Sequence, residues 1–322
     1  MKPYASLSLD LDNQWAYMKT HGDAGWQSYP SYFDAIVPRI LGFLAARRLT
    51  ITFFIVGQDA ALPANRASLA SIAAAGHEIG NHSFNHEPWL HLYSAQELDR
   101  ELFRAEEAIE AATGVRPRGF RGPGFSLSEE TLEALVRRGY DYDATVFPNL
   151  LNPLARAYLF STSRLTDEQK KQRSALFGTW KDAFRPVRPF QWRLAAGRLL
   201  EIPVTTLPLF KVPMHLSYLI YLARFSPAAA RAYLRFALGA CRLTGTQPSI
   251  LLHPLDFMGS EDCPSLAFFP GMDVARERKL AIVSDLFDIL AARHELVAMR
   301  EHARRASAVR EGLPTLAPVF PA

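Results

Sequence analysis

Short apolar runs alternate with helical patterns along the first 145 residues, and this alternation is what most restricts the fold. Residues 5–11 have the pattern of a short buried strand that ends at acidic residues, and residues 51–56 are rich in residues that favour strands. Further strands are predicted at 77–80, 119–121 and 139–145. Alternating strands and helices call for a parallel sheet or barrel, so an α/β fold is predicted.

Helix start and stop signals separate these strands. Ser94 has the character of an N-cap with Glu97 three residues later, which predicts a helix over 95–113 that ends at Gly114. Other helices are predicted at 32–48 with Pro38 in the first turn, at 68–75 before Gly76, and at 128–138.

The pattern loosens after residue 147, where a stretch rich in proline and aromatic residues runs to about 190. A helix at 226–243, a strand at 249–252 and a helix at 273–293 follow. We therefore predict one catalytic domain over 1–303, with an insertion at about 147–245 and a loosely ordered tail at 304–322. A (β/α) barrel with a long insertion fits this order, and barrel chemistry lies at the carboxyl ends of the strands.

Composition excludes several classes of protein. Hydrophobic residues make up 49% and charged residues 21%, which argues against general disorder. The net charge is +4 with a pI near 9.1, and the basic residues are spread out, so no nucleic-acid partner is predicted. The two cysteines, Cys241 and Cys263, are expected to be reduced structural thiols.

The start of the sequence carries charges where a signal peptide needs an apolar core, and no run of 18 apolar residues is present. A cytoplasmic protein is expected, and peripheral contact with a membrane stays open. The oligomeric state is not predicted.

Three groups of polar residues follow predicted strands. Asp10 and Asp12 end the first strand, where one carboxylate could bind a cation while the other takes a proton from water; either could serve in either role. His82 and His86, four residues apart, could bind one metal ion together with a carboxylate. His253 ends an apolar strand, a position suited to a general acid. Each group alone is also compatible with a purely structural role.

Taken together, the order and spacing of these groups resemble the NodB-homology polysaccharide deacetylases, carbohydrate esterase family 4, over roughly residues 5–257. The segment Arg121-Gly122-Pro123 is similar to the Arg-x-Pro motif of that family, and residues 139–145 to the strand that follows it. Residues 199–206 resemble a segment of the exosortase-associated deacetylases. The resemblance implies a distorted (β/α) barrel of the NodB-homology type.

The resemblance also implies roles for single residues. Asp12, His82 and His86 match the metal ligands of the family, which usually hold zinc. Asp10 matches the catalytic base, Arg121 the arginine that orients it, and His253 the acid. The backbone N–H near Gly124 would help to hold the developing oxyanion. The expected reaction is metal-dependent hydrolysis that removes an N-acetyl or other N-acyl group from a saccharide.

Two departures from the family pattern loosen the assignment of the substrate. The aspartates are separated by one residue, as in the allantoinase-like branch, and no convincing partner for His253 is found, with Asp182 as a weak candidate. An allantoinase-like or deformylating amide hydrolase and a catalytically silent carbohydrate-binding homologue remain alternatives.

Residues 208–243 are unusually apolar and are punctuated by arginines. They are expected to form either a cap helix that packs on the barrel, or an apolar groove or interfacial surface for a lipid-linked sugar.

Overall fold

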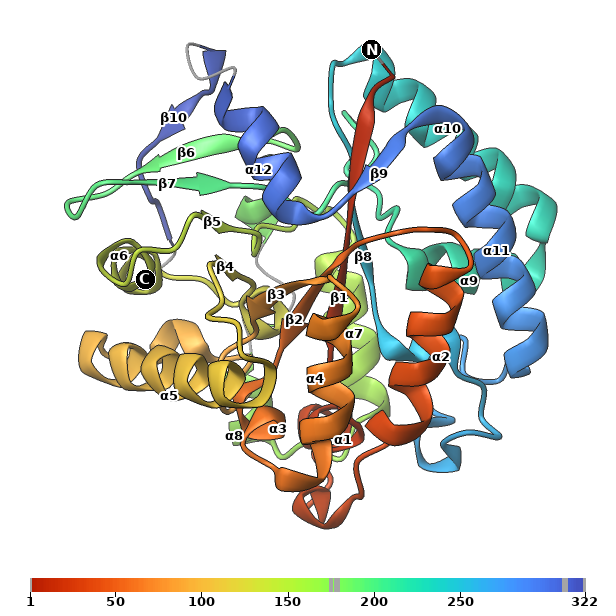
Figure 1. Ribbon diagram of the computed structural model, residues 1–322, viewed down its shortest axis with the longest axis horizontal. Coiled ribbons are helices and arrows are strands. Elements are labelled where there is room, and N and C mark those ends of the chain that lie inside the picture. The colour runs from red at the N-terminus through yellow and green to blue at the C-terminus, as the bar shows by residue number, and fades with distance from the viewer. Residues whose placement is uncertain (1, 174–175, 177–179, 309–311, 321–322) are drawn as a thin grey trace.

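Parallel strands form the centre of the molecule, and helices surround them (Figure 1). The computed structural model describes residues 2–173, 176, 180–308 and 312–320. The strands are β1 (Tyr4–Leu11), β2 (Thr52–Ile55), β3 (Glu78–Asn81), β4 (Gly119–Phe120), β5 (Tyr142–Asp143), β6 (Phe190–Arg193), β7 (Arg198–Glu201), β8 (Ser249–Leu252), β9 (Glu295–Val297) and β10 (Thr315–Leu316).

The order of strands in the sheet is β10-β6-β7-β5-β4-β3-β2-β1-β8, and β9 pairs with β1. Within the described residues, all pairs are parallel except β6 with β7. The sheet closes on itself because the Thr205 N–H, just after β7, donates to the Ser249 carbonyl at 3.0 Å. The predicted distorted (β/α) barrel is therefore confirmed.

Helices on the outside of the barrel follow the chain order. They are α1 (Gln14–His21), α2 (Phe33–Ala45), α3 (Gly57–Ala60), α4 (Arg66–Ala74), α5 (Ala95–Thr113), α6 (Glu129–Arg137), α7 (Asn152–Thr162), α8 (Asp167–Gln172), α9 (Leu216–Phe225), α10 (Pro227–Leu243), α11 (Arg276–Arg293) and α12 (Met299–Ala308). Helix α5 has the predicted bounds, and both hydrogen bonds of the capping box between Ser94 and Glu97 are present.

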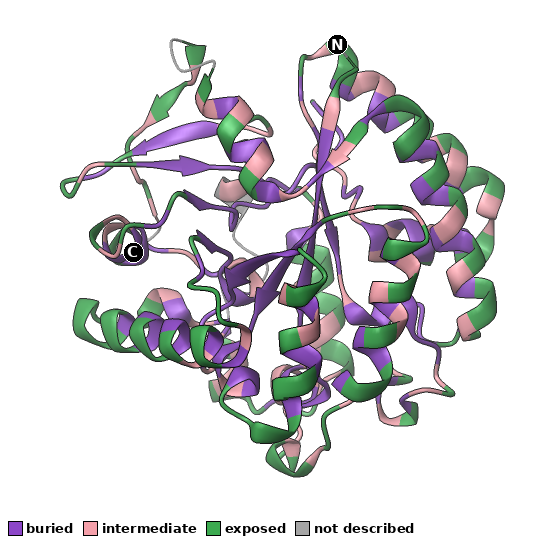
Figure 2. Ribbon diagram, in the orientation of Figure 1, coloured by how far each residue is buried: buried purple, intermediate pink, exposed green. Residues whose placement is uncertain are grey.

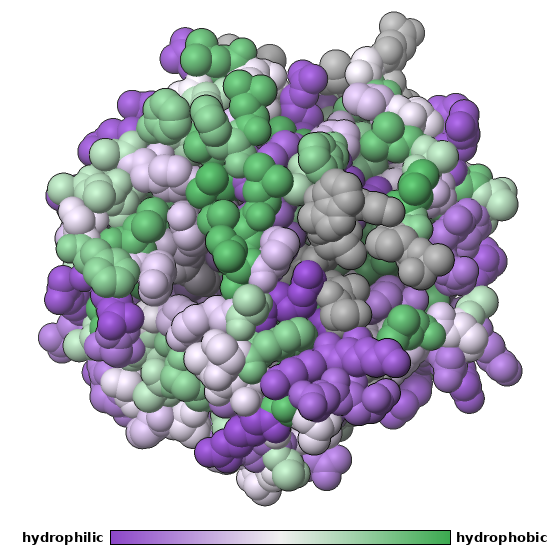
Figure 3. Space-filling view, turned by 180° about the vertical axis from the view of Figure 1, so that it is seen from behind, coloured by the Kyte–Doolittle hydropathy of each residue, from purple (hydrophilic) through white to green (hydrophobic). Residues whose placement is uncertain are grey.

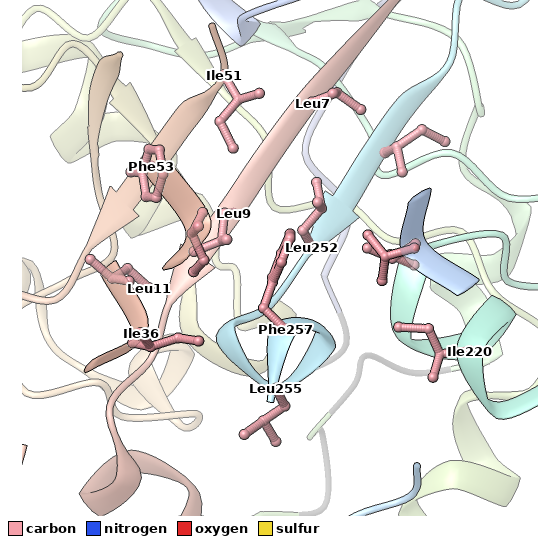
Figure 4. Packing of buried hydrophobic residues seen from close by; sticks show 14 of the residues in the cluster. Leu7, Leu9, Leu11, Ile36, Ile51, Phe53, Ile220, Leu252, Leu255 and Phe257 are labelled. Carbon is pink, nitrogen blue, oxygen red and sulfur yellow. The ribbon is translucent and has the colours of Figure 1, made fainter. Parts of the chain in front are cut away.

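Alternation along β1 sorts its side chains between two environments. Leu7, Leu9 and Leu11 point outward into the main hydrophobic core beneath the helices (Figure 4). Ser8 and Asp10 face the inside of the barrel, where both contact Arg121. Strands β1 to β8 are largely buried, β9 and β10 are more exposed, and the helices alternate between buried and exposed faces (Figure 2).

Several sequence predictions need correction. Pro38 lies inside α2 rather than in its first turn, so the helix tolerates one missing backbone donor. The loose stretch after residue 147 contains α7, α8 and β6, and α9 precedes the predicted helix α10.

The tail predicted to be loosely ordered at 304–322 continues α12 and adds β10, which pairs with β6. Ala306 of α12 is buried, which explains why this part of the tail is held. Residues 309–311 and 321–322 of that tail lie outside the described residues.

Two further expectations concern cysteines and membrane spans. Cys241 and Cys263 are free and buried, as predicted. Among the described residues, no helix combines the length and the apolar character needed to cross a membrane.

Candidate active site

The carboxyl ends of four strands supply the candidate residues, and β2, which lies between β1 and β3, supplies none. Asp10 lies near the end of β1 and Asp12 directly after it, His82 follows β3, Arg121 follows β4, and His253 follows β8. Because the strands are parallel, these ends lie at one edge of the barrel, the edge that carries the chemistry in such folds.

The first group is the buried set Asp12, His82 and His86. Their candidate ligand atoms all lie within 4.8 Å of one another. The Nε2 atom of His86 is 3.0 Å and that of His82 is 3.5 Å from Asp12 Oδ1. All three residues are buried, so the structure brings together the three residues that sequence analysis grouped as metal ligands.

The chemistry of this set fits a divalent metal ion. Asp12 Oδ1 is buried and has no hydrogen-bond partner among the described residues, although two imidazole nitrogens are close to it. His82 Nδ1 lies 2.6 Å from the Arg121 carbonyl, which can only accept, so Nδ1 carries the proton and Nε2 keeps its lone pair. Two imidazoles and one carboxylate are a common ligand set that leaves positions open for water.

Electrostatics agree with this geometry. Burial alone would raise the pKa of Asp12, but interactions with His86 and His82 outweigh burial and hold that pKa far below its usual range. Burial would lower the pKa of His82, but the carboxylates of Asp10 and Asp12 raise it above its usual value. Both shifts arise because the buried carboxylates favour positive charge at this point, whether it is a proton on an imidazole or a bound cation.

A tight loop after β3 positions the two histidines. Ser83 and His86 adopt left-handed backbone conformations, with φ of 61° and 50°. The buried carboxylate of Glu101 on α5 holds the loop by accepting the backbone N–H groups of Phe84 and Asn85 at 2.9 and 2.6 Å. The strain of the two unusual conformations is thus offset by hydrogen bonds from outside the loop.

Asp10 lies beside the metal group and is held by Arg121. The guanidinium Nη1 is 3.3 and 3.4 Å from the two carboxylate oxygens, and Nη2 donates to Ser8 Oγ at 3.1 Å. Arg121 is fully buried, and its guanidinium lies 4.8 Å from the ring of Phe54. These contacts fix the direction of the Asp10 carboxylate, the arrangement expected of an oriented base.

His253 has a partner that sequence analysis missed. Asp256 Oδ2 accepts the His253 backbone N–H at 2.8 Å, and Asp256 Oδ1 accepts the hydroxyl of Ser217 at 2.7 Å. Ser217 Oγ lies 3.1 Å from His253 Nδ1. Since the single hydroxyl proton goes to the carboxylate, Oγ accepts a hydrogen bond from Nδ1–H, and Nε2 takes no part in this network.

The earlier candidate for this role, Asp182, forms an ion pair with Arg185 at 2.9 Å. The carboxylate that lies beside His253 is Asp256. A signal for Asp256 was present, because a carboxylate three residues after the histidine can cap the turn that follows it. Ser217 comes from α9 and gave no signal in the sequence.

Tyr17 is a further residue that the sequence did not single out. Its hydroxyl is buried and has no hydrogen-bond partner among the described residues. Burial, and then the charges of Asp12, Asp256 and Asp10, raise its pKa well above the usual value. The hydroxyl therefore stays protonated within electrostatic reach of both the metal group and the His253 pair.

Comparisons with known proteins bear on the same region. The sequence profile of the polysaccharide deacetylase family matches residues 23–142. Over 117 residues the chain is 31% identical to a peptidoglycan deacetylase of Helicobacter pylori, covering 36% of this chain and 39% of that protein. It is 32% identical, also over 117 residues, to a peptidoglycan-N-acetylmuramic acid deacetylase of Bacillus subtilis, covering 36% and 42%.

The chain thus spans about two fifths of the length of these curated relatives. A crystal structure from Mycobacterium smegmatis, assigned provisionally as a polysaccharide deacetylase, superposes with a TM-score of 0.65 and 21% identity, covering 100% of this chain and 96% of that one. That likeness shows the fold. The sequence similarity to polysaccharide deacetylases lies within residues 23–142, and over that segment the chain resembles the family.

Proposed function

We propose that the protein is a metal-dependent hydrolase that removes an N-acyl group, acetyl in the first instance, from a saccharide. The observation that carries the proposal is the meeting of Asp12, His82 and His86 at one buried point, with the oriented carboxylate of Asp10 beside it. Both named relatives are deacetylases of peptidoglycan, which is an N-acetylated polymer.

Asp12, His82 and His86 would hold the ion, and we propose zinc because two imidazole nitrogens and one carboxylate suit it. A divalent ion bound there would polarise the acyl carbonyl and make a bound water more acidic. Asp10 accepts the proton of the attacking water, and Arg121 keeps both of its oxygens in place.

His253 completes the reaction at the leaving nitrogen. Nδ1 is engaged by Ser217, so the proton passes from Nε2 to the amine as the C–N bond breaks. The carboxylate of Asp256 offsets the positive charge that His253 carries before this transfer. The hydroxyl of water ends on the carbonyl carbon, so the products are a carboxylate and a free amine.

The finer identity of the substrate is part of the proposal. We propose a lipid-linked N-acyl sugar that is met inside the cell at or near the membrane. The support is the exposure of two large apolar side chains, Leu209 and Phe210, in the turn after β7. A deformylating or allantoinase-like activity would use the same residues. The presence of Asp10, Asp12, His82, His86 and His253 together supports an active enzyme over a silent carbohydrate-binding homologue.

The test is purification of the protein, measurement of bound metal, and assay of acid release from N-acetylated and N-formylated saccharides. We expect acetate release that a chelator abolishes and added zinc restores. Release of formate alone would favour the deformylating alternative. No acid release from any of these substrates by the metal-loaded protein would contradict the proposal.

A further inference from the structure

An apolar turn projects from the carboxyl edge of the barrel. It is closed by hydrogen bonds from the Leu207 N–H to the Val212 carbonyl and from the Lys211 N–H to the Leu207 carbonyl, both 2.8 Å. At its tip, Leu209 is 83% and Phe210 is 61% exposed. Leu209 and Lys211 have φ of 70° and 52°, conformations that side chains rarely adopt. A strained turn therefore holds two large apolar side chains out in solvent.

Helix α7 and the residues before it extend the apolar surface of this turn. The Leu150 N–H donates to the Lys211 carbonyl at 3.0 Å, so Leu150 lies against the turn. Leu154 and Tyr158 share one face of α7 and are 67% and 52% exposed. We call Leu150, Leu154, Tyr158, Leu209 and Phe210 the rim patch. Apolar residues gather on the face of the molecule seen in Figure 3.

The rim patch adjoins the candidate active site. Thr206 Oγ1, just before the turn, donates to the Pro148 carbonyl at 2.8 Å, which ties the turn to the segment that follows β5. Between them, the ring of Phe147 lies 4.6 Å from Phe125 and 5.6 Å from His215. His215 lies two residues before Ser217, so an aromatic wall connects the patch with the side of the site that carries His253.

The two chain segments that carry the patch are cationic. Residues 144–166 and 202–215 contain no aspartate or glutamate and three cationic residues, Arg156, Arg164 and Lys211. Arg164 pairs with Asp23, whereas the Lys211 ammonium, within the turn itself, donates to the Arg185 carbonyl at 2.8 Å. Exposed leucine and aromatic side chains beside such a cation are typical of surfaces that enter the interface of an anionic membrane.

We propose that the rim patch docks on a bilayer that contains anionic phospholipid, with Leu209 and Phe210 inserted among the acyl chains. A second copy of the chain fits the patch less well. A protruding turn offers little of the roughly 800 Å² per partner that a stable interface buries, and the same acid-free segments would repel each other. Docking would bring the open edge of the barrel to the membrane surface, where a lipid-linked substrate is found.

The experiment measures sedimentation of the whole protein with vesicles of phosphatidylcholine alone and of phosphatidylcholine with 30% phosphatidylglycerol. We expect binding to the anionic vesicles that weakens with added salt. The variant Leu209→Ser with Phe210→Ser should bind at least about tenfold more weakly, because it removes two inserted apolar side chains.

The matched control is the variant Phe236→Ser with Leu243→Ser. These side chains are 60% and 90% exposed, so similar apolar area is removed, and they lie on α10, whose end leads to the start of β8, away from His253. We expect this control to bind vesicles like the unaltered protein. Circular dichroism and thermal unfolding check that both variants are folded.

Absence of vesicle binding, or equal binding by the two folded double variants, would overturn the proposal. A dimer in light scattering that the Leu209→Ser, Phe210→Ser variant abolishes, without vesicle binding, would instead assign the patch to a second copy. The measurement needs no substrate, so it separates docking from the proposed hydrolysis. Vesicle binding by a protein that releases no acid would leave docking standing and remove the proposed function.

Discussion

Replacement of Ser217 by alanine is the sharpest test of how His253 is held. The hydroxyl lies 3.1 Å from His253 Nδ1 and 2.7 Å from Asp256 Oδ1, and it is the link between them. Without it, the Nδ1 proton loses its acceptor and a buried carboxylate oxygen loses a donor. The hydrogen bond from the His253 backbone N–H to Asp256 remains, so the substitution removes the hydrogen bond that orients the ring and weakens its charge compensation.

The expected loss follows from the strength of such contacts. Hydrogen bonds to charged groups contribute about 1.5–3 kcal/mol. If most of this acts in the transition state, kcat falls by about 10- to 100-fold, because each factor of ten is about 1.4 kcal/mol. A general acid contributes about 10²- to 10⁴-fold, so His253→Ala should lose more than Ser217→Ala. Ser217→Thr keeps the hydroxyl and should stay close to the unaltered protein.

The assay compares two substrates that differ in their leaving group. An N-acetylated glucosamine oligosaccharide needs a proton on its departing nitrogen, whereas 4-nitrophenyl acetate releases a stable anion that needs none. We expect Ser217→Ala to lower kcat on the amide and to leave turnover of the ester within a few-fold. An equal loss on both substrates, or a loss in Ser217→Thr as large as in Ser217→Ala, would refute the role of the hydroxyl in proton transfer.

Three further predictions concern the metal group and a buried histidine. Asp12→Ala and His82→Ala should each lose bound metal in elemental analysis, and full occupancy in both would remove the ligand assignment. Asp10→Asn should keep the metal and lose most turnover; if it loses metal while Asp12→Asn keeps it, the two aspartates exchange roles. Burial lowers the pKa of His302 to about 3 from its usual 6.5, so below pH 6.5 the unfolded chain binds a proton that the native chain does not. Stability should therefore fall with pH, by about 2 kcal/mol between pH 7 and 5 from this group alone, at about 1.4 kcal/mol per pH unit below its usual pKa. Urea unfolding at pH 7 and 5 should show a smaller loss of unfolding free energy for His302→Gln than for the unaltered protein. An equal loss in the two proteins would count against this role of His302.

The meeting of the candidate residues was predictable because topology does most of the positioning. Asp12 and His82 each follow a strand that the sequence marked clearly, and parallel strands bring their carboxyl ends to one edge. Arg121 follows by the same rule. What the structure adds is the direction of each side chain, such as the contact of Arg121 with Ser8 that turns its guanidinium toward Asp10.

The features that the sequence did not predict depend mainly on packing between segments that are distant in the chain. Ser217 reaches His253 because α9 lies on the turn after β8, a contact that no local pattern encodes. Helix α7 was missed because its outer face is apolar and exposed, so it lacks the polar face that marks a surface helix. The tail at 304–322 looked loosely held because it is rich in small and basic residues, yet His302 of the same helix α12 meets Ser6 at 2.7 Å.

The pairing of β1 has a consequence for how the protein folds during synthesis. β1 carries both aspartates, and its neighbours are β2, β8 and β9, of which β8 begins at Ser249 and β9 at Glu295. When the first half of the chain has left the ribosome, β1 has one partner and an open edge of unpaired backbone groups, which is a site for wrong pairing. The segment 23–142 that matches the family profile contains neither β1 nor β8. Residues 23–142 therefore lack the strand that carries both aspartates and one of its partners, so they cannot form the barrel by themselves.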